Sequence, residues 1–532
     1  MKRRRWIAMA LCGTMLAGVL AGCGGGDTQE SSSAEGGDAA AKDTIVFSDD
    51  EWYGTDPYQQ DTWSSIQSLI SDPLFTLDPA TGDLLDGICT DLTVSEDGLT
   101  MTATVPEGKY YATGEQVEPE DVVASIEWGK EVSPYADGYA NIESMEVDGR
   151  NVIFHLSTFR SDLLYYLGEC FMGVIDKDQL DSMSKDELMW GAVPYGLYYV
   201  ESYEPGTGVT LAVNEGYKSD NPLVTNKGPA QIPHAEVKFN TNQEEFTILE
   251  ELKAGDIDYV NRISADGRAQ LEGMDGFQVV NKTYPIIQYF ELNTDEGSIF
   301  EDPNVRLAMI LSIDRDALCE LVDGAAVPGY SIIYDTMKNF SQAAKDDFME
   351  NYANDPERAQ QLLAESGWTD SDGDGYLDKD GQPLEFTFYV DSTGTSQTIV
   401  QGLQEQMKNA GFLMNIETVD WNYIHEYIHN DEYDAGLQSL EWAEPILILN
   451  ACYYDQDAPG NDEAYYAAVE DAAETVDGNE RTEKIGEIQI NMFKNCNIIP
   501  FFSNLSYIAY GDQVKGIVIQ ADSSLYWNDL SF

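Results

Sequence analysis

The sequence predicts a mixed α/β fold for most of its 532 residues. Short runs of β-branched and aromatic residues, such as residues 44–47 and 152–156, alternate with segments whose apolar residues recur at helical spacing. Hydrophobic residues make up 43% of the chain and aromatic residues 11%, so the chain can bury a sizeable core. A chain of this length is expected to form about two to four domains.

Three helices are predicted from the residues at their ends. Pro119, followed by two acidic residues, predicts a helix start, because acidic side chains favour the positive end of the helix dipole. Pro356 begins a second helix, and Gly367 ends it because glycine can take the left-handed cap conformation. A third helix is expected to have Ser396 as its N-cap and to end at Gly411.

The chain carries a large negative charge. It has 95 acidic residues and 29 Lys or Arg residues, which gives a formal net charge of −66. This balance argues against a protein that binds nucleic acid by neutralising phosphates. It is more typical of an exposed protein adapted to its medium than of a site for a cationic ligand, and such a charge keeps a protein soluble.

The N-terminus has the pattern of a secretory signal. Residues 2–5 are basic and residues 6–22 form an apolar run, which is marginal for a membrane span. The run ends in Leu-Ala-Gly-Cys, which resembles the lipobox of bacterial lipoproteins. The expectation is therefore a signal peptide at 1–22, a lipidated Cys23 and a flexible tether to residue 43, with an uncleaved N-terminal anchor as the alternative. The chain would then sit outside the cytoplasm, lipid-anchored at the outer face of the bacterial cell membrane.

Five cysteines remain after Cys12 and Cys23. Their spacings are long and include no C-x-x-C, so neither a thioredoxin-type site nor a zinc ribbon is supported. Burial as small hydrophobic residues is the expected role, and disulfides stay open in a protein outside the cytoplasm. They are Cys89, Cys170, Cys319, Cys452 and Cys496.

Several separated segments resemble the extracytoplasmic solute-binding proteins of the oligopeptide, dipeptide and nickel class (family 5), which serve ABC importers. The first segment leads through a turn into the helix at Pro119, and the second is a Pro-Tyr-Gly turn with a following strand. A third reads D-x-x-V-R-x-A and has I-D-R at residues 313–315. The segments are residues 105–126, 193–206, 302–318, 419–423 and 497–502, with Asp434 before the last.

The resemblance implies a type II periplasmic-binding-protein-like fold with an extra third domain. Two lobes are joined by two strand crossings and hold the ligand in the cleft between them. Lobe I is expected at residues 44–77, 195–285 and 500–532. The extra domain is expected at residues 78–194, and lobe II at residues 286–499.

The resemblance also implies ligand-binding residues. By their family positions, Trp421 and Trp442 line the cleft. In peptide-binding members, a carboxylate just after a Trp pairs with the peptide's α-amino group, but this sequence lacks that Asp. Glu441 or Glu444 is expected to replace it, with solvated loop charge as the alternative for both.

Four further residues are candidates. Tyr289 and Asn293 resemble the family's strand where the chain enters lobe II. Trp52 and Tyr53, near the start of lobe I, are expected either to stack on the ligand or to pack in the core.

The function implied is that of a binding protein without enzymatic activity. The lipoprotein would capture a small solute, an oligopeptide or dipeptide above all, by hinge closure. It would act as a monomer and deliver the solute to an ABC permease driven by a cytoplasmic ATPase, and nucleic acid is not an expected partner. A sugar, a modified peptide, a chelated metal and a sensor without a transport role stay open.

An acidic loop resembles the start of an EF-hand calcium loop. Asp370, Asp372, Asp374 and Asp378 occupy loop positions 1, 3, 5 and 9, and glycine occupies position 6. Position 12 is Gly381, where an EF-hand has a bidentate Glu. The binding function is expected to require no cofactor. For the acidic loop, a structural calcium ion and a bare acidic turn both remain open.

Residues 425–429 match the metalloprotease motif H-E-x-x-H. On a helix, this spacing puts His425 and His429 on one face with a Glu able to activate zinc-bound water. A surface zinc metallopeptidase is therefore the alternative function. The family resemblance accounts for the same helix without a metal.

Overall fold

The structure is a computed structural model that describes residues 42–60, 64–78, 81–241, 243–519 and 525–532. The predicted signal peptide, Cys23 and most of the predicted tether lie outside the described residues. Within the described ranges, every helix is too short or too polar to span a membrane.

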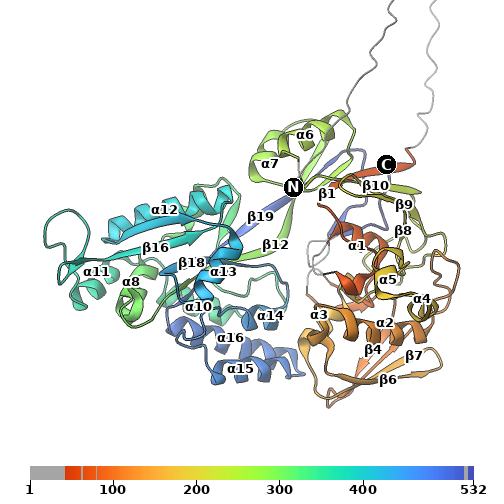
Figure 1. Cartoon of the computed structure of the whole chain (residues 1–532), viewed down its shortest axis with the longest axis horizontal. Coiled ribbons are helices and arrows are strands. Elements are labelled where there is room, and N and C mark those ends of the chain that lie inside the picture. The colour runs from red at the N-terminus through yellow and green to blue at the C-terminus, as the bar shows by residue number, and fades with distance from the viewer. Residues whose placement is uncertain (1–41, 61–63, 79–80, 242, 520–524) are drawn as a thin grey trace, which may run out of the picture. The chain divides into compact units, whose positions relative to one another are not determined.

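One large sheet runs through the described residues (Figure 1). Strand β1 is parallel to β10 and β11, β16 is parallel to β17 and β18, and β12 is antiparallel to β18 and β19. This mixed sheet, flanked by helices, confirms the α/β prediction. In spatial order the strands are β17 (Leu413–Thr418), β16 (Glu385–Val390), β18 (Ala435–Leu440), β12 (Phe277–Leu292), β19 (Ile498–Gly511), β11 (Tyr259–Ile263), β1 (Thr44–Asp49), β10 (His234–Phe239), β9 (Gly208–Val213) and β8 (Tyr198–Glu204), and β13 (Ala326–Pro328) pairs with β19.

The two longest strands, β12 and β19, connect the two halves of this sheet. They are 16 and 14 residues long and pair antiparallel. Their register shifts between Lys282 and Ile286, where four steps along β12 oppose two steps along β19. Extra residues of this kind bend a strand locally and interrupt the ladder of hydrogen bonds between β12 and β19.

A second, antiparallel sheet lies within residues 90–156. Its order is β4 (Thr90–Val94), β5 (Thr100–Thr104), β7 (Asn151–Leu156) and β6 (Ile142–Asp148). Three two-stranded sheets complete the described strands: β2 (Phe75–Leu77) with β3 (Leu84–Asp86), β14 (Asp378–Lys379) with β15 (Gln382–Pro383), and β20 (Val518–Ile519) with β21 (Leu525–Tyr526).

The helices fall into one group before strand β12 and another after it. Before β12 they are α1 (Ser65–Ile70), α2 (Pro119–Val132), α3 (Ser161–Leu167), α4 (Lys177–Ser182), α5 (Lys185–Gly191), α6 (Glu245–Ala254) and α7 (Ala265–Leu271). After β12 they are α8 (Pro303–Leu311), α9 (Arg315–Glu320), α10 (Gln342–Asn351), α11 (Pro356–Glu365), α12 (Gly394–Ala410), α13 (Trp421–His429), α14 (Pro445–Asn450), α15 (Glu463–Ala473) and α16 (Gly478–Lys494).

The described part of the chain has two large clusters of buried hydrophobic residues. One cluster draws on residues 287–502. The other draws on residues 45–259 and 508–530, and includes both Ile45 of β1 and Phe154 of β7. The predicted extra domain and lobe I therefore share one core, while the predicted domain boundaries remain predictions.

Most of the helix ends agree with the sequence. Helix α2 begins at Pro119 and α11 at Pro356, and both Gly367 and Gly411 have the left-handed φ values, 86° and 94°, expected of caps. The prediction of Ser396 as an N-cap is wrong. The N-cap of helix α12 is Thr393, three residues earlier, and the Asp391 side chain accepts a hydrogen bond from the Thr393 N–H at 2.6 Å in the turn before the helix.

The five described cysteines are all buried, and none forms a disulfide with another. Burial raises the pKa of the Cys89 and Cys319 thiols to about 12, so these side chains stay protonated. The expectation of small buried hydrophobic residues is confirmed for these positions.

Candidate functional site: a cavity at the carboxyl ends of three strands

A cavity of about 850 Å³ opens where the parallel strands β16, β17 and β18 end. Its lining includes Asp391 directly after β16, Asp420 after β17, and Glu441 and Trp442 directly after β18. Carboxyl ends of parallel strands meet at one edge of a sheet, and ligands of α/β proteins bind outside that edge. The other lining residues are Arg262, Gln288, Ser392, Thr393, Ser396, Trp421, Ser439, Leu440, Tyr454 and Asn504.

Aromatic side chains form one wall of the cavity. Trp421 is 42% exposed and Trp442 36% exposed, which is unusual for such large apolar rings. Tyr454 joins them, and the His425 ring packs against both Trp421 and Tyr454, with centroids 3.9 and 4.4 Å away. These rings offer partly exposed flat surfaces on which a ligand can pack.

Polar atoms without partners lie on the same lining. The Gln288 side chain donates to the Ser439 hydroxyl at 2.9 Å, but its Oε1 has no hydrogen-bond partner among the described residues. The same is true of the Ser396 hydroxyl and of Asn504 Oδ1. A buried polar atom without a hydrogen-bond partner costs free energy, so a ligand that supplies partners to these atoms would bind more tightly.

The acidic residues of the cavity differ in what they already bind. Asp391 accepts from the Thr393 N–H at 2.6 Å, and Asp420 accepts from the Asn422 N–H at 3.0 Å as the N-cap of α13. Glu441 accepts no hydrogen bond and forms no ion pair with any described residue. Of the three carboxylates, Glu441 is therefore the one whose bonding capacity is unused in the described part of the chain.

Trp52 and Tyr53 lie in a smaller cavity of about 70 Å³ that shares Arg262 with the larger one. The Trp52 side chain is buried and its ring meets Trp190 edge-on at 5.8 Å, whereas Tyr53 is 54% exposed. Trp52 therefore packs mainly within the protein, and Tyr53 is the side chain that has a free face in this cavity.

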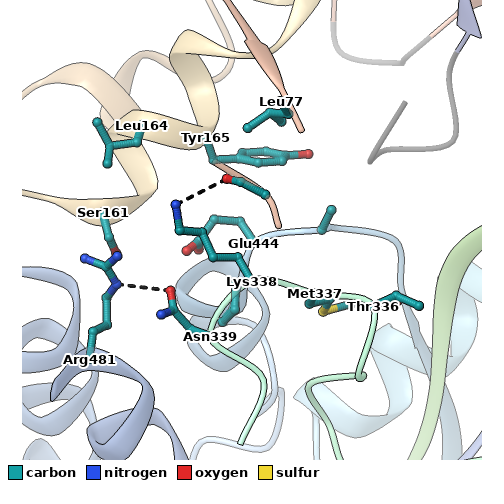
Figure 2. Close-up of a pocket in the computed structure, with 13 residues that line it drawn as sticks. Leu77, Ser161, Leu164, Tyr165, Thr336, Met337, Lys338, Asn339, Glu444 and Arg481 are labelled. Atoms are coloured by element: carbon teal, nitrogen blue, oxygen red, sulfur yellow. Dashed lines mark hydrogen bonds between the residues drawn. The ribbon is translucent and has the colours of Figure 1, made fainter. Parts of the chain in front are cut away.

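Glu444 lies in neither of these cavities. It caps α14, where its Oε2 accepts from the Leu447 N–H at 2.8 Å, and it is buried in a cavity of about 50 Å³ with Lys338, Asn339 and Arg481 (Figure 2). Burial, and then the negative charge of Asp162, raise the pKa of Glu444 to about 8. Its proximity in sequence to Glu441 does not bring the two carboxylates to the same cavity.

Tyr289 and Asn293 lie on β12 or just beyond it, and neither lines the large cavity. Tyr289 is fully buried in the core, since alternate residues of a strand face opposite sides, and its neighbour Gln288 faces the cavity. Asn293 is buried and its Oδ1 accepts from the Asp295 N–H at 2.8 Å, which fixes the turn after β12.

A sequence model of "Bacterial extracellular solute-binding proteins, family 5 Middle" matches residues 84–447, which is more than half of the chain. The chain belongs to this family of bacterial extracellular solute-binding proteins. The match spans β16, β17 and β18, and so includes the strand ends that form the large cavity. The resemblance stated from the sequence is confirmed.

Named relatives of this solute-binding protein align with more than four fifths of its length. The oligopeptide-binding protein AppA of Bacillus subtilis (strain 168) is 22% identical over 463 residues, which are 83% of this chain and 82% of the relative. The dipeptide-binding protein of Escherichia coli (strain K12) is 22% identical over 489 residues, covering 85% and 86% of the two chains.

Solved structures share the fold. NikA from Brucella suis, in complex with Fe(III)-EDTA, superposes with a TM-score of 0.77 at 19% identity and covers 92% of this chain and 99% of its own. AppA from Bacillus subtilis, in complex with a nonapeptide, gives a TM-score of 0.68 at 18% identity, with 92% and 99% covered. The two-lobed fold class predicted for this solute-binding protein is therefore confirmed.

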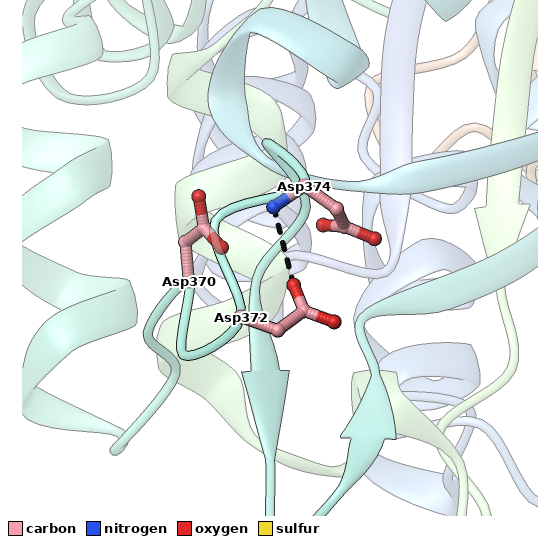
Figure 3. A group of neighbouring side chains, drawn as sticks. All are labelled: Asp370, Asp372 and Asp374. Atoms are coloured by element: carbon pink, nitrogen blue, oxygen red, sulfur yellow. Dashed lines mark hydrogen bonds between the residues drawn. The ribbon is translucent and has the colours of Figure 1, made fainter.

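The acidic loop of the solute-binding protein brings three carboxylates together. Asp370, Asp372 and Asp374 offer oxygen atoms within 4.8 Å of one another, and the Asp374 N–H donates to Asp372 at 3.1 Å (Figure 3). Asp378 instead accepts from the Ser371 N–H and hydroxyl at 2.9 and 2.8 Å. These hydrogen bonds lower the pKa of Asp378.

The H-E-x-x-H motif lies on α13, as expected, but its histidines have different surroundings. His425 is half-buried between aromatic rings, and this burial lowers its pKa to about 4, whereas His429 is exposed. Among the described residues, the acidic loop is the one group of three or more possible metal ligands within 4.8 Å, and it includes neither histidine.

Proposed function

We propose that this chain is the substrate-binding lipoprotein of an ABC importer, which captures a short peptide and delivers it to a membrane permease. The observation that carries the proposal is the large cavity, where partly exposed aromatic rings and polar atoms without described partners lie on one lining. Rings offer apolar contact to varied side chains, and the polar atoms pair with the amide groups that every peptide has. This combination suits a binder of broad sequence range.

The peptide's amino end is proposed to pair with Glu441. This carboxylate lies directly after β18, beside Trp442, and has no described partner of its own. A peptide ammonium group would give it a charge-assisted hydrogen bond. Glu444 is the weaker candidate because the α14 cap already uses its carboxylate.

Capture is proposed to involve closure of the two lobes about β12 and β19. The register shift between Lys282 and Ile286 interrupts the ladder in the long pair of strands, and such a site can absorb a change in backbone angle. The protein is proposed to work as a monomer, held at the outer face of the membrane through lipid on Cys23.

The acidic loop is proposed to hold a structural calcium ion. Three carboxylates within 4.8 Å of one another repel when ionised, and a hard cation with oxygen ligands removes that repulsion. The ion would stabilise the turn before β14 and would take no part in binding the peptide.

Replacing Trp442 by alanine tests the proposed site. Binding of a pool of random tripeptides to the purified protein, followed by isothermal titration calorimetry, should weaken about 10-fold or more in the variant, because a stacking surface is lost. Phe246→Ala is the matched control, since Phe246 is 63% exposed on α6 and lines none of the cavities described above. Equal binding by the wild type and the Trp442→Ala variant would contradict the assigned site, and the absence of binding to the wild type would contradict the peptide proposal.

A further inference from the structure

Arg262 is set apart from the other arginines in the described part of the chain. Seven of them donate at least one side-chain hydrogen bond. Arg262 donates none, and no carboxylate oxygen of a described residue lies within 4.0 Å of its guanidinium group. This is notable in a chain with 95 acidic and 29 basic residues, where a partner is readily found.

A β-bulge determines where Arg262 lies. On β11, Val260 pairs with Ala509 and Ile263 pairs with Tyr507, so two residues of β11 lie opposite one residue of β19. The first of the two, Asn261, is buried and donates to Asp49 at 3.0 Å, whereas Arg262 is exposed. Bulges re-aim side chains next to functional sites, and here the extra residue places Arg262 in the cavity lining.

Arg262 is also the residue common to both cavities. It lines the large cavity with Glu441 and Trp442, and the smaller one with Tyr53. A group bound to its guanidinium would therefore lie between the rings contributed by lobe I and those contributed by lobe II. The guanidinium has five donors in a planar fork, which match a carboxylate with two parallel hydrogen bonds.

The charges around Arg262 are otherwise negative. Asp391, Asp420 and Glu441 line the large cavity, and Asp49, Asp50 and Glu51 line the smaller one. A ligand with two anionic groups would meet repulsion from these carboxylates, and a ligand without any would leave Arg262 unpaired. A zwitterion satisfies both sides, with its cation toward the acidic residues and its anion on Arg262.

We propose that Arg262 is a specificity-determining residue that binds a carboxylate of the ligand, so the site selects zwitterionic peptides over ligands without an anionic group. The inference rests on the proposed peptide-binding function and adds the ligand's second charged end to it. The carboxylate comes either from the peptide's C-terminus or from an acidic side chain, and the chemistry at Arg262 is the same.

The test uses three pools of tripeptides without Trp or Tyr, titrated into the purified protein while its tryptophan fluorescence is followed. One pool has free C-termini, the second is the same pool as C-terminal amides, and the third consists of amides that each contain one Glu. The wild type should bind the free acids about 10-fold or more tightly than the plain amides, as expected for a charge-assisted hydrogen bond. In Arg262→Gln this preference should disappear, while binding of the plain amides stays unchanged.

The variants separate the outcomes. Arg358→Gln, which changes an exposed arginine of α11, should keep the wild-type preference, and Arg262→Lys should keep part of it. If the Glu-containing amides bind as tightly as the free acids and lose this in Arg262→Gln, a side-chain carboxylate can take the place of the C-terminus at Arg262. If they bind only as tightly as the plain amides, the carboxylate at Arg262 is the C-terminus. Equal binding of acids and plain amides by the wild type, or equal weakening of both in Arg262→Gln, would overturn the role of Arg262 and leave the peptide proposal standing. Failure of the wild type to bind any pool would overturn the peptide proposal and this inference together.

Discussion

Substitution of Glu444 by glutamine should change how the stability of this protein depends on pH. The Glu444 carboxyl group is buried near Asp162, and this burial raises its pKa to about 8 from an ordinary 4.5. Glutamine keeps an oxygen that can accept from the Leu447 N–H, so the cap of α14 is retained. The substitution therefore removes the titration with little change in shape.

The sign and size follow from linkage. The folded-state pKa lies above the unfolded value, so the folded protein binds more protons in the window between them, and the free energy of unfolding falls as pH rises through that window. Between about pH 5.5 and 8.5, a shift from about 4.5 to about 8 corresponds to a loss of roughly 3 kcal/mol in the wild type. The Glu444→Gln variant should lack this component.

Urea unfolding at the two pH values measures the difference. The wild type should lose about 3 kcal/mol more than Glu444→Gln between about pH 5.5 and 8.5. Glu357→Gln, at an exposed position in the first turn of α11, is the control and should follow the wild type. Identical pH dependence in the wild type and Glu444→Gln would refute the argument that burial keeps this carboxyl group protonated.

Three further predictions concern the other charged sites. Glu441→Gln should weaken the binding of peptides with a free amino end about 10-fold and leave the binding of N-acetylated peptides unchanged, as measured by calorimetry. Equal weakening for both kinds of peptide would contradict the assignment of Glu441 to the peptide's amino end. Calcium should raise the melting temperature of the wild type and not that of Asp372→Asn, because the substitution removes one of three clustered carboxylates, and a scan with and without chelator checks this. Metal analysis should find no stoichiometric zinc in the wild type, since His429 is exposed and no third described ligand lies close enough to complete a zinc site with His425 and His429. Stoichiometric zinc in the wild type that is lost in His429→Ala would reopen the peptidase alternative.

The sequence was sufficient to predict the fold class and the ends of several helices. Pro119, Pro356 and Gly411 act through local backbone chemistry, so their roles could be read without knowing the tertiary structure. The start of α12 was mispredicted at Ser396. A serine is a good N-cap in isolation, but the turn set by Asp391 starts the helix earlier and leaves Ser396 facing the cavity.

The cavity was predictable in part. Trp421, Glu441 and Trp442 were expected from family positions, and the structure brings all three to one lining. Glu444, three residues after Glu441, is not separable from it by sequence. Helix α14 begins directly after Glu444, and the side chain of this N-cap residue lies in a different cavity. Whether any of these residues binds ligand remains a prediction.

Other lining residues gave weaker signals. Strand alternation along β12 could have singled out Gln288, since a polar side chain next to the buried Tyr289 must face the other side. Arg262 had no such signal, because a β-bulge breaks the alternation on which the prediction depends.

Native mass spectrometry of the protein, purified without refolding and then denatured to release what it carried, tests the central claim most directly. The account predicts a set of released masses that match short peptides, each bound with a stoichiometry of one. A single released compound that is not a peptide, or a metal chelate without peptide, would contradict the account while leaving the solute-binding family in place.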